Sequence, residues 1–357
     1  MRALVLTDFH QLDLVETARP EPGPGEVLLR ICATGICGSD FHGFTGDNGR
    51  RGPGQIMGHE SSGTIAALGA GVDAAALPVG APATFNPVVV PDELVEQYRD
   101  REQHAPGKQV IGVAREVQAS FADYLVVPER NVLLLDPAMP LHLGALIEPL
   151  AVAVHAVGLG GPRPGETALV VGGGPIGQSV VLALQRAGAR DIAVSERDPR
   201  RRELVAALGV TALDPSAAPL AEQVGAVLGA PADLAVDAVG LSATLTDALA
   251  ATALGGRVVL VGMGSPRLEL DAFAISTEER SVIGSFTYSA RDFADAATWI
   301  GEHVHQVTPL VSSIVGPEQA QESFTALAAG RGPAGKILVR FDEHDPSDRL
   351  DQEERPA

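Results

Sequence analysis

The chain has little cysteine, few aromatic residues and a deficit of basic side chains. Its two cysteines, Cys32 and Cys37, are too few for the disulfide framework of small secreted proteins. Lysine and arginine total 26 against 45 aspartate and glutamate residues, which gives a net charge of −19. Because such an acidic surface repels phosphate backbones, we expect no nucleic-acid partner.

Long apolar segments are also missing. The N-terminal residues lack the apolar core of a signal peptide, and there is no uncharged apolar run of about 18 residues. The most apolar stretch, 143–159, is interrupted by Glu148, Pro149 and His155. We therefore expect a cytoplasmic protein with no membrane partner.

The 357 residues, 45% of them hydrophobic, correspond to about two domains with ample core material. Residues 1–135 consist of short apolar runs bounded by glycine and proline, which is typical of a compact β-rich domain. The strands expected there are Arg2–Leu6, Glu26–Ala33, Ser61–Leu68, Ala81–Asn86 and Ala122–Val127.

The pattern changes near residue 141, where helix-type apolar spacing begins. From Thr167 onward, β-branched runs alternate with Ala- and Leu-rich segments, which indicates a parallel, doubly wound α/β sheet. The strands expected there are 168–171, 191–195, 234–237, 258–261 and 282–284. The helices expected there are 178–187, 200–208 and 242–251.

From about Asp292 the sequence predicts a helix over 293–302 that leads to the segment 307–315, then a helix over 317–329 and a strand over 336–341. The tail, 342–357, is charged and almost devoid of apolar residues. We expect this acidic tail to be disordered.

A glycine turn follows the first strand of the α/β region. Gly172, Gly174 and Gly177 form G-x-G-x-x-G, with Pro175 and Ile176 between them, and a predicted helix follows. Glu196 ends the next predicted strand, 19 residues beyond Gly177. In this context the pattern predicts a dinucleotide site, with the pyrophosphate on the helix N-terminus.

The same turn bears on the choice of cofactor. The carboxylate of Glu196 would accept hydrogen bonds from the adenosine ribose and repel a 2′-phosphate, so we expect NAD rather than NADP. Four arginines crowd the following turn and either offset that repulsion or form the solvated face of the next helix. They are Arg197, Arg200, Arg201 and Arg202.

Metal-ligand side chains occur in three separate segments. Cys37 lies in 35–42, His59 and Glu60 are adjacent, and Glu148 precedes Pro149. A catalytic zinc takes three protein ligands of sulfur, nitrogen or oxygen type and leaves one position open. Each residue alone has an ordinary structural interpretation, such as a buried thiol or a helix cap. Their occurrence beside a dinucleotide turn favours a zinc site.

The sequence resembles the zinc-dependent medium-chain dehydrogenases of the alcohol dehydrogenase superfamily, and most of all their sorbitol (polyol) dehydrogenase branch. The resemblance covers about residues 1–341. It is carried by the motifs GICGSDFH at 35–42, MGHE at 57–60, EPL at 148–150, GGGPIG at 172–177 and DAVG at 237–240.

The resemblance implies a GroES-like catalytic domain over 1–149, a Rossmann dinucleotide-binding domain over 150–289, and a return to the catalytic domain over 290–341. It implies hydride transfer from a secondary alcohol, such as a polyol, to NAD(P)⁺. It also implies a homodimer or homotetramer paired through a strand near 282–286.

For the site, the resemblance implies one catalytic zinc at Cys37, His59 and Glu60. Glu148 is either a further ligand or a carboxylate that can swap onto the metal. Ser39 matches the proton-relay hydroxyl and His42 the distal proton acceptor.

The remaining expected cofactor contacts lie around the sheet crevice. Ile176 and Arg201 would flank the nucleotide, and Val261, Gly262 and Met263 end a predicted strand at that crevice. Ser285 and Phe286, with Thr287, either lie beside the nicotinamide or belong to the strand core.

Two departures from the family pattern stand out. Residues 86–107 contain no cysteine, so we expect no structural zinc, and the charged stretch 92–103 predicts a helix instead. Polyol members often carry an arginine near Thr287, and its absence argues against sorbitol itself.

The substrate and the class of the protein have alternatives. Arg50 and Arg51 either receive a phosphorylated polyol or belong to a solvated loop, which we favour; an aminocyclitol precursor would need identical chemistry. The low aromatic content, 4%, fits a small polar alcohol. A zinc-free reductase or a non-catalytic nucleotide-binding protein would not need the zinc residues.

Overall fold

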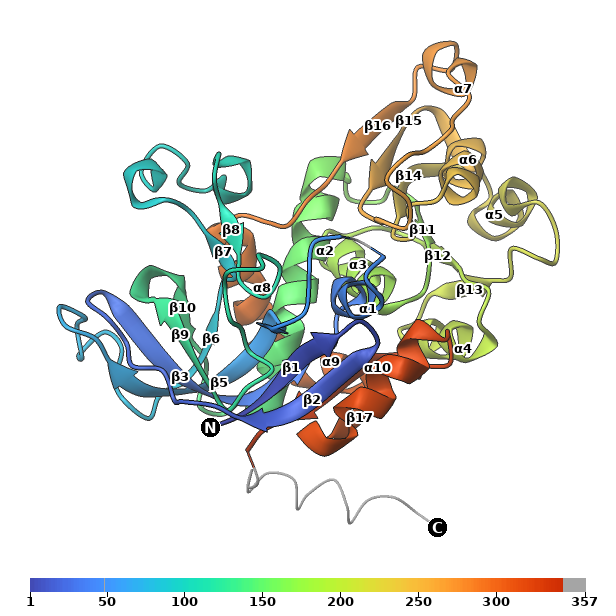
Figure 1. Cartoon of the computed structure of the whole chain (residues 1–357). Coiled ribbons are helices and arrows are strands. Elements are labelled where there is room, and N and C mark those ends of the chain that lie inside the picture. The colour runs from blue at the N-terminus through green and yellow to red at the C-terminus, as the bar shows by residue number, and fades with distance from the viewer. Residues whose placement is uncertain (48, 343–357) are drawn as a thin grey trace. The chain divides into compact units, whose positions relative to one another are not determined.

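The computed structural model describes residues 1–47 and 49–342, and most of the expected disordered tail lies outside these ranges. The chain forms two compact units. Unit 1 comprises Met1–Glu148, Ala297–Gly332 and the chain from Lys336 onward, and unit 2 comprises Pro149–Ala296 with Pro333–Gly335. In the colours of Figure 1 the strands of unit 1 run from blue to teal, except for β17 (Val311–Val315) and β18 (Lys336–Arg340) in red, and the sheet of unit 2 runs from green to orange.

Unit 1 is built around β3 (Glu26–Gly35), a long and largely buried strand in a sheet of order β10-β6-β5-β3-β18-β17, with β9 also paired to β3. The other strands of this sheet are β5 (Glu60–Leu68), β6 (Pro82–Phe85), β9 (Tyr124–Pro128), β10 (Val132–Leu134), β17 (Val311–Val315) and β18 (Lys336–Arg340). A second sheet contains β1 (Arg2–Asp8), β2 (Gln11–Glu16) and β4 (Gln55–Ile56), and a two-stranded sheet contains β7 (Val88–Val89) and β8 (Gln109–Val110). Because β18 pairs antiparallel with β3, the end of the described chain completes the sheet that its beginning starts.

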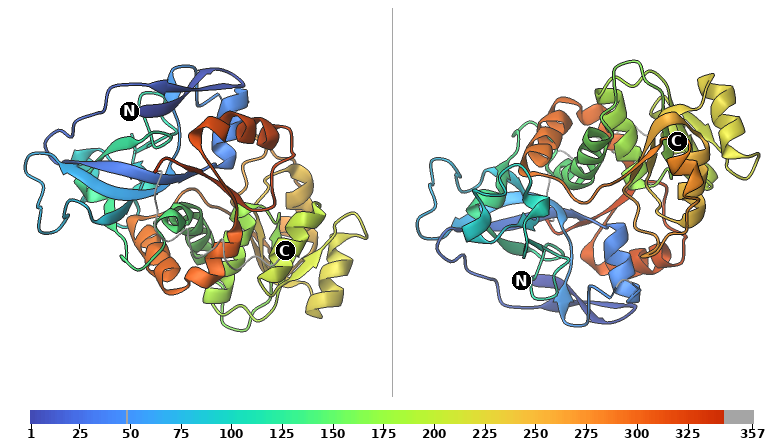
Figure 2. Two further views of the ribbon diagram at one scale, coloured as in Figure 1. Left: turned by 90° about the horizontal axis from the view of Figure 1, so that it is seen from below. Right: turned by 90° about the horizontal axis from the view of Figure 1, so that it is seen from above.

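Two helices of unit 1 share an aromatic core. Helix α1 (Gly38–Thr45) lies beside α10 (Ala320–Ala328), the blue and red helices of Figure 2. The rings of Phe44 and Phe324 lie 5.5 Å apart between them, and both are almost fully buried. This packing fixes α1 and the loop before it. The unit also contains the short helix α9 (Val304–Val307).

Unit 2 has the expected doubly wound α/β fold. Its six strands are all parallel, in the order β13-β12-β11-β14-β15-β16. They are β11 (Ala168–Val171), β12 (Ile192–Ser195), β13 (Thr211–Leu213), β14 (Ala232–Asp237), β15 (Thr252–Leu260) and β16 (Ser281–Gly284). The order reverses between β11 and β14, which is where such sheets bind ligands beyond the carboxyl ends of their strands.

Helices cover both faces of this sheet. Val170 of β11 packs into a core with α3, and its neighbour Leu169 packs into a second core with α5 and α6, as the alternation of a strand requires. The helices on these faces are α2 (Ile147–Gly160), α3 (Pro175–Arg186), α4 (Pro199–Ala207), α5 (Leu220–Leu228), α6 (Ser242–Ala250) and α7 (Phe273–Ser276). Helix α8 (Ala290–Glu302) begins in unit 2 and ends in unit 1.

Two expected elements are wrong in detail. The predicted helix 92–103 is only two 3₁₀ turns, Asp92–Leu94 and Glu102–His104, because Asp100 between them has a φ of 61°, which no helix accommodates. The helix expected near 141–158 begins as a 3₁₀ turn, Leu141–Leu146, and continues as α2.

The helical stretch Leu141–Gly160 is long and apolar enough to cross a membrane. Within the described residues it is the one such stretch, and 72% of its most apolar segment is buried inside the structure. That burial is what a core helix of a globular fold shows.

Candidate metal centre and dinucleotide turn

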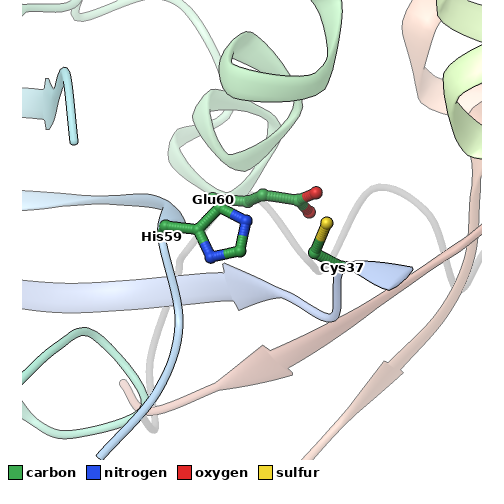
Figure 3. A group of neighbouring side chains, drawn as sticks. All are labelled: Cys37, His59 and Glu60. Atoms are coloured by element: carbon green, nitrogen blue, oxygen red, sulfur yellow. The ribbon is translucent and has the colours of Figure 1, made fainter. Parts of the chain in front are cut away.

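The sulfur, nitrogen and oxygen donors predicted from the sequence converge in unit 1. Strand β3 pairs with β5 so that Gly35 lies opposite Glu60, which brings Cys37, two residues on, close to the start of β5. The side chains of Cys37, His59 and Glu60 point toward one another in Figure 3, and their ligand atoms all lie within 4.8 Å of one another. A Cβ on Gly35 would lie 2.3 Å from the Glu60 carboxylate, so this glycine leaves the space that the carboxylate fills.

These residues fit a zinc ion. One thiol, one imidazole and one carboxylate are the donor types that zinc takes in catalytic sites, and three protein ligands leave a position for substrate. Asp40 Oδ1 lies 3.5 Å from Nδ1 of His59, which leaves Nε2 of the ring as the ligand nitrogen. A carboxylate behind a ligating histidine is the usual way in which proteins orient such a ring.

The charges around His59 favour a cation at this place. Burial lowers the pKa of His59, but the negative charges of Asp40, Cys37 and Glu148 outweigh it and raise the pKa to about 10. Without a metal, the imidazole therefore carries a proton at neutral pH. A metal ion that binds here replaces that proton.

A buried lysine, which the sequence analysis missed, holds one of the candidate ligands. Nζ of Lys336 lies 2.7 Å from each carboxylate oxygen of Glu60, and both side chains are essentially inaccessible to solvent. Burial lowers the pKa of Lys336, but the charges of Glu60, Cys37 and Glu148 outweigh this and leave it raised. The ammonium therefore stays charged. The only signal in the sequence is a lysine at the start of an otherwise apolar strand.

Glu148 lies close to the cluster but is not part of the group of three. It is buried at the start of α2, and its charge raises the pKa values of both His59 and Lys336. The structure thus places two carboxylates near the same point, one of them already paired with a lysine.

The residues expected to move the proton lie on α1. Ser39 is half-buried in the first turn, and His42, one turn later, is exposed and packs against the ring of Phe41 at 4.5 Å. Asp40 braces the loop before α1, because its Oδ2 accepts the backbone N–H of Cys37 at 3.1 Å.

The solvated-loop interpretation of 50–51 is wrong for Arg51. Arg50 is exposed, whereas Arg51 is buried, with only 1% of its surface accessible. Its Nη2 donates to Asp40 Oδ1 at 3.0 Å and to Ser39 Oγ at 3.1 Å. The position of the Arg51 side chain is thus determined by the opposite charge of Asp40 and by the residues that enclose it, and not by solvent.

The cysteine-free lobe, residues 86–107, is held by contacts of its first residues. Nδ2 of Asn131 donates to the carbonyls of Asn86 and Val88 at 2.7 and 2.9 Å. Arg130 pairs with Asp92 at 2.8 Å and donates to the carbonyl of Val90. These bonds join the first residues of the cysteine-free segment to the 3₁₀ turn Glu129–Asn131.

The glycine turn of unit 2 has the geometry of a phosphate cradle. Gly172 follows β11 with a φ of 98°, and Pro175 opens α3 at its first position. A Cβ on Gly177 would lie 1.8 Å from the carbonyl oxygen of Gly172, so only glycine permits this close approach. The half-buried N-terminus of α3 offers free N–H groups and positive potential to an anion.

Glu196 lies beside this turn but is already hydrogen-bonded. Its Oε2 accepts the N–H of Gly173 and its Oε1 that of Asp198, both at 2.8 Å. Arg201 Nη1 lies 3.9 Å from the same carboxylate. Of the other arginines, Arg200 pairs with Asp198, and Arg202 pairs with Asp214 and the carbonyl of Glu196.

The other expected cofactor contacts lie just beyond strand ends. Val261, Gly262 and Met263 follow β15, and Ser285 and Phe286 follow β16. These segments are therefore loops at the carboxyl edge of the sheet rather than strand core. The Ser285 hydroxyl is buried and, among the described residues, has no hydrogen-bond partner.

Two family models match the chain. Residues 23–137 match the alcohol dehydrogenase GroES-like domain, and residues 175–302 match the zinc-binding dehydrogenase domain. The chain is 30% identical to a probable D-xylulose reductase A of Emericella nidulans, over 92% of this chain and 94% of that protein. It is 32% identical to the L-galactonate-5-dehydrogenase of Escherichia coli K12, over 85% and 88%.

Solved structures share the whole fold. An alcohol dehydrogenase of E. coli CFT073 in complex with NADH has a TM-score of 0.86 and 27% identity, over 96% of this chain and 99% of that one. A zinc-binding dehydrogenase of Sinorhizobium meliloti 1021 bound to NADP has a TM-score of 0.83 and 27% identity, over 95% and 99%.

Proposed function

This chain belongs to the zinc-dependent medium-chain dehydrogenases of the alcohol dehydrogenase superfamily, and we propose that it oxidises a secondary hydroxyl of a small polyol with NAD⁺. It is an oxidoreductase of the alcohol and polyol dehydrogenase type that uses zinc and a nicotinamide cofactor. The observation that carries the proposal is the cluster of Cys37, His59 and Glu60 around one point, with His59 and Glu60 buried and Cys37 half-buried. A zinc-free reductase or a non-catalytic nucleotide-binding protein would not need these donors.

Each side chain of the centre has a separate task. Cys37, His59 and Glu60 would hold a zinc ion, which would supply Lewis acidity to the substrate hydroxyl, and a nicotinamide held at the glycine turn of unit 2 would supply the capacity to take up hydride. Asp40 orients the imidazole of His59, and Lys336 fixes the carboxylate of Glu60.

The proton of the substrate hydroxyl leaves through α1. The resemblance assigns its acceptance to Oγ of Ser39 and its delivery to solvent to His42. The exposure of His42 supports that outlet, because it lets the ring exchange a proton with solvent.

An unphosphorylated polyol is the favoured substrate. The relatives are named for D-xylulose and L-galactonate, both of which carry several hydroxyls. Arg51, one of two candidate phosphate-binding arginines, is buried against Asp40 and not presented to a ligand. A hydroxyl on an aminocyclitol would need the same chemistry.

The experiment that tests this function is a rate measurement with zinc-loaded protein on a panel of alcohols, followed by the absorbance of reduced nicotinamide. The panel contains xylitol and other polyols, aminocyclitols, sugar phosphates and hydrophobic primary alcohols. The proposal expects the highest kcat/KM on a polyol. Activity confined to hydrophobic primary alcohols would contradict it.

NAD is the proposed cofactor, because the carboxylate of Glu196 beside the glycine turn would repel a 2′-phosphate. Arg200 and Arg202 pair with acidic residues, which weakens the case for a 2′-phosphate site. The ratio of kcat/KM for NAD⁺ to that for NADP⁺ should exceed 1 and should fall in Glu196→Gln. A ratio below 1 in the wild type would reverse the assignment.

We further propose a cytoplasmic homodimer or homotetramer. Strand β16 is an edge of its sheet, and Val282 on it and Phe286 beyond it are exposed, so the edge offers unpaired backbone groups with apolar side chains. Light scattering of the purified protein should give at least twice the 36.9 kDa of one chain. A monomeric mass would contradict the assembly without affecting the chemistry.

A further inference from the structure

We propose that Arg51 is a positioning residue of this enzyme: one guanidinium nitrogen holds both the carboxylate behind the ligand histidine and the hydroxyl of the proton relay. The proposal rests on the proposed function for the role of Ser39. It stands on the two hydrogen bonds that Nη2 donates, to Asp40 Oδ1 at 3.0 Å and to Ser39 Oγ at 3.1 Å.

The first bond connects Arg51 to the metal centre. Asp40 Oδ1, which accepts from Arg51, is also the oxygen that lies 3.5 Å from Nδ1 of His59. Asp40 is fully buried, and its Oδ2 is fixed by the N–H of Cys37. Arg51 therefore holds the carboxylate of Asp40 in the rotamer that faces His59. The positive charge of Arg51 also neutralises the negative charge of Asp40.

The second bond determines how the hydroxyl of Ser39 is oriented. A guanidinium donates hydrogen bonds and cannot accept them, so Arg51 occupies an acceptor position on Oγ and the hydrogen of Ser39 must point elsewhere. A hydroxyl that accepts a charge-assisted hydrogen bond is also a better proton donor. Arg51 thereby favours proton transfer in one direction: Oγ of Ser39 accepts the proton of the substrate hydroxyl while it gives up its own proton toward solvent.

The surrounding chain leaves room for this arginine. A Cβ on Gly43 would lie 2.0 Å from Cδ of Arg51, so the side chain passes where α1 has no side chain of its own. Nη2 of Arg115 donates to the carbonyl of Arg51 at 2.9 Å and fixes its backbone. A buried guanidinium is thus held in place at both its backbone and its head group.

Burying this group is unfavourable for folding. Among the described residues, Nε and Nη1 of Arg51 have no hydrogen-bond partner. Buried donors without partners destabilise a fold, so their retention calls for another explanation. The contacts of Nη2 with Asp40 and Ser39 supply a functional one.

The test compares Arg51→Met with Arg2→Met. Arg2 pairs with Asp123 at 2.9 Å in the same unit and takes no part in the metal centre, so it controls for the loss of an arginine–aspartate pair. Zinc affinity is measured by competition with a chelator, in the absence of cofactor and substrate. We expect Arg51→Met to weaken zinc binding about 10- to 100-fold, the usual effect of removing support behind a ligand, and Arg2→Met to leave it unchanged. Equal zinc affinities in the two variants would overturn the proposal that Arg51 supports the metal centre.

The relay is tested at saturating zinc. Arg51→Met should lower kcat by about 10-fold or more with little change in KM, and should lower it much less in a Ser39→Ala background, because the hydroxyl that it orients is then absent. An equal loss of kcat in both backgrounds would overturn the role of Arg51 at Ser39.

A second variant covers the case in which Arg51→Met does not fold. Arg51→Lys keeps a charge for Asp40, but its nitrogen lies one bond closer to Cα than Nη2 does and so does not reach both partners. We expect it to keep most of the zinc affinity and lose kcat; wild-type values for both would overturn the proposal. If the wild type bound zinc but oxidised no alcohol, the proposed function would fail, and zinc affinity would still decide whether Arg51 supports His59.

Discussion

The buried pair of Lys336 and Glu60 gives the strongest prediction about stability. Lys336→Met removes the ammonium but keeps an unbranched chain of similar length. The carboxylate of Glu60, with 0% of its side chain accessible, is then left without its cation in the metal-free protein. The pair is joined by contacts of 2.7 Å to both oxygens, so no water replaces the ammonium without rearrangement.

The magnitude follows from this geometry. Removing one partner of a buried ion pair destabilises a protein by about 3–5 kcal/mol, because the remaining charge is uncompensated. At about 2–4 °C per kcal/mol for a unit of this size, the melting temperature of unit 1 should fall by about 6–20 °C. Zinc supplies positive charge next to the same carboxylate, so the loss should be clearly smaller in the zinc-loaded protein.

Differential scanning calorimetry with chelator and with zinc measures both values. Lys108→Met, at the other lysine of the chain, is the control and should change stability by about 0.5 kcal/mol or less. The double variant Glu60→Gln with Lys336→Met, which removes both charges, should recover much of the loss. A loss below about 1 kcal/mol for Lys336→Met in the metal-free protein would refute the reasoning.

Three further predictions concern other parts of the chain. Gly177→Ala places a Cβ 1.8 Å from the Gly172 carbonyl and should weaken NADH binding at least about 10-fold in a fluorescence titration, whereas Gly225→Ala, with open space around its Cβ, should not. Burial raises the pKa of the Asp292 carboxyl, but hydrogen bonds from His155 and Ser289 outweigh it and leave that pKa below 3.8. The ionised carboxylate of Asp292 therefore stabilises the fold fully above pH 3.8, and this contribution is lost as the pH falls through the lower pKa of the folded state. Asp292→Asn should therefore lose less stability in acid than the wild type in pH-dependent thermal melts, and parallel curves would exclude this role. Arg130→Met should lower resistance to proteolysis in 86–107 without changing zinc content, and a loss of zinc would show that the lobe supports the metal.

The sequence alone was sufficient to predict a site where the residues that form it are close together in the chain. The glycine turn could be predicted because its glycines, strand and helix are contiguous, and the adjacency of His59 and Glu60 marked the metal centre. The sheet of unit 2 could be predicted because each of its buried strands is a short apolar run between helical segments.

The residues that support the metal centre, Lys336 and Arg51, could not be predicted, because their positions depend on contacts between segments far apart in the sequence. Lys336 is 276 residues from Glu60 and reaches it only because β18 pairs with β3. Arg51 has the local pattern of a solvated loop, and its burial depends on the space at Gly43 and on the charge of Asp40. The helix predicted over 92–103 from its charged residues does not form either, because Asp100 has a positive φ, which ends a helix.

The most direct test of the account is the zinc coordination shell of the wild type and of Cys37→Ser, measured by X-ray absorption spectroscopy after metal analysis. The account predicts one zinc per wild-type chain, with one sulfur at about 2.3 Å and nitrogen and oxygen ligands at about 2.0–2.2 Å, and loss of both zinc and activity in Cys37→Ser. A wild-type shell without sulfur, or a metal-free variant that still oxidises the alcohol, would contradict it.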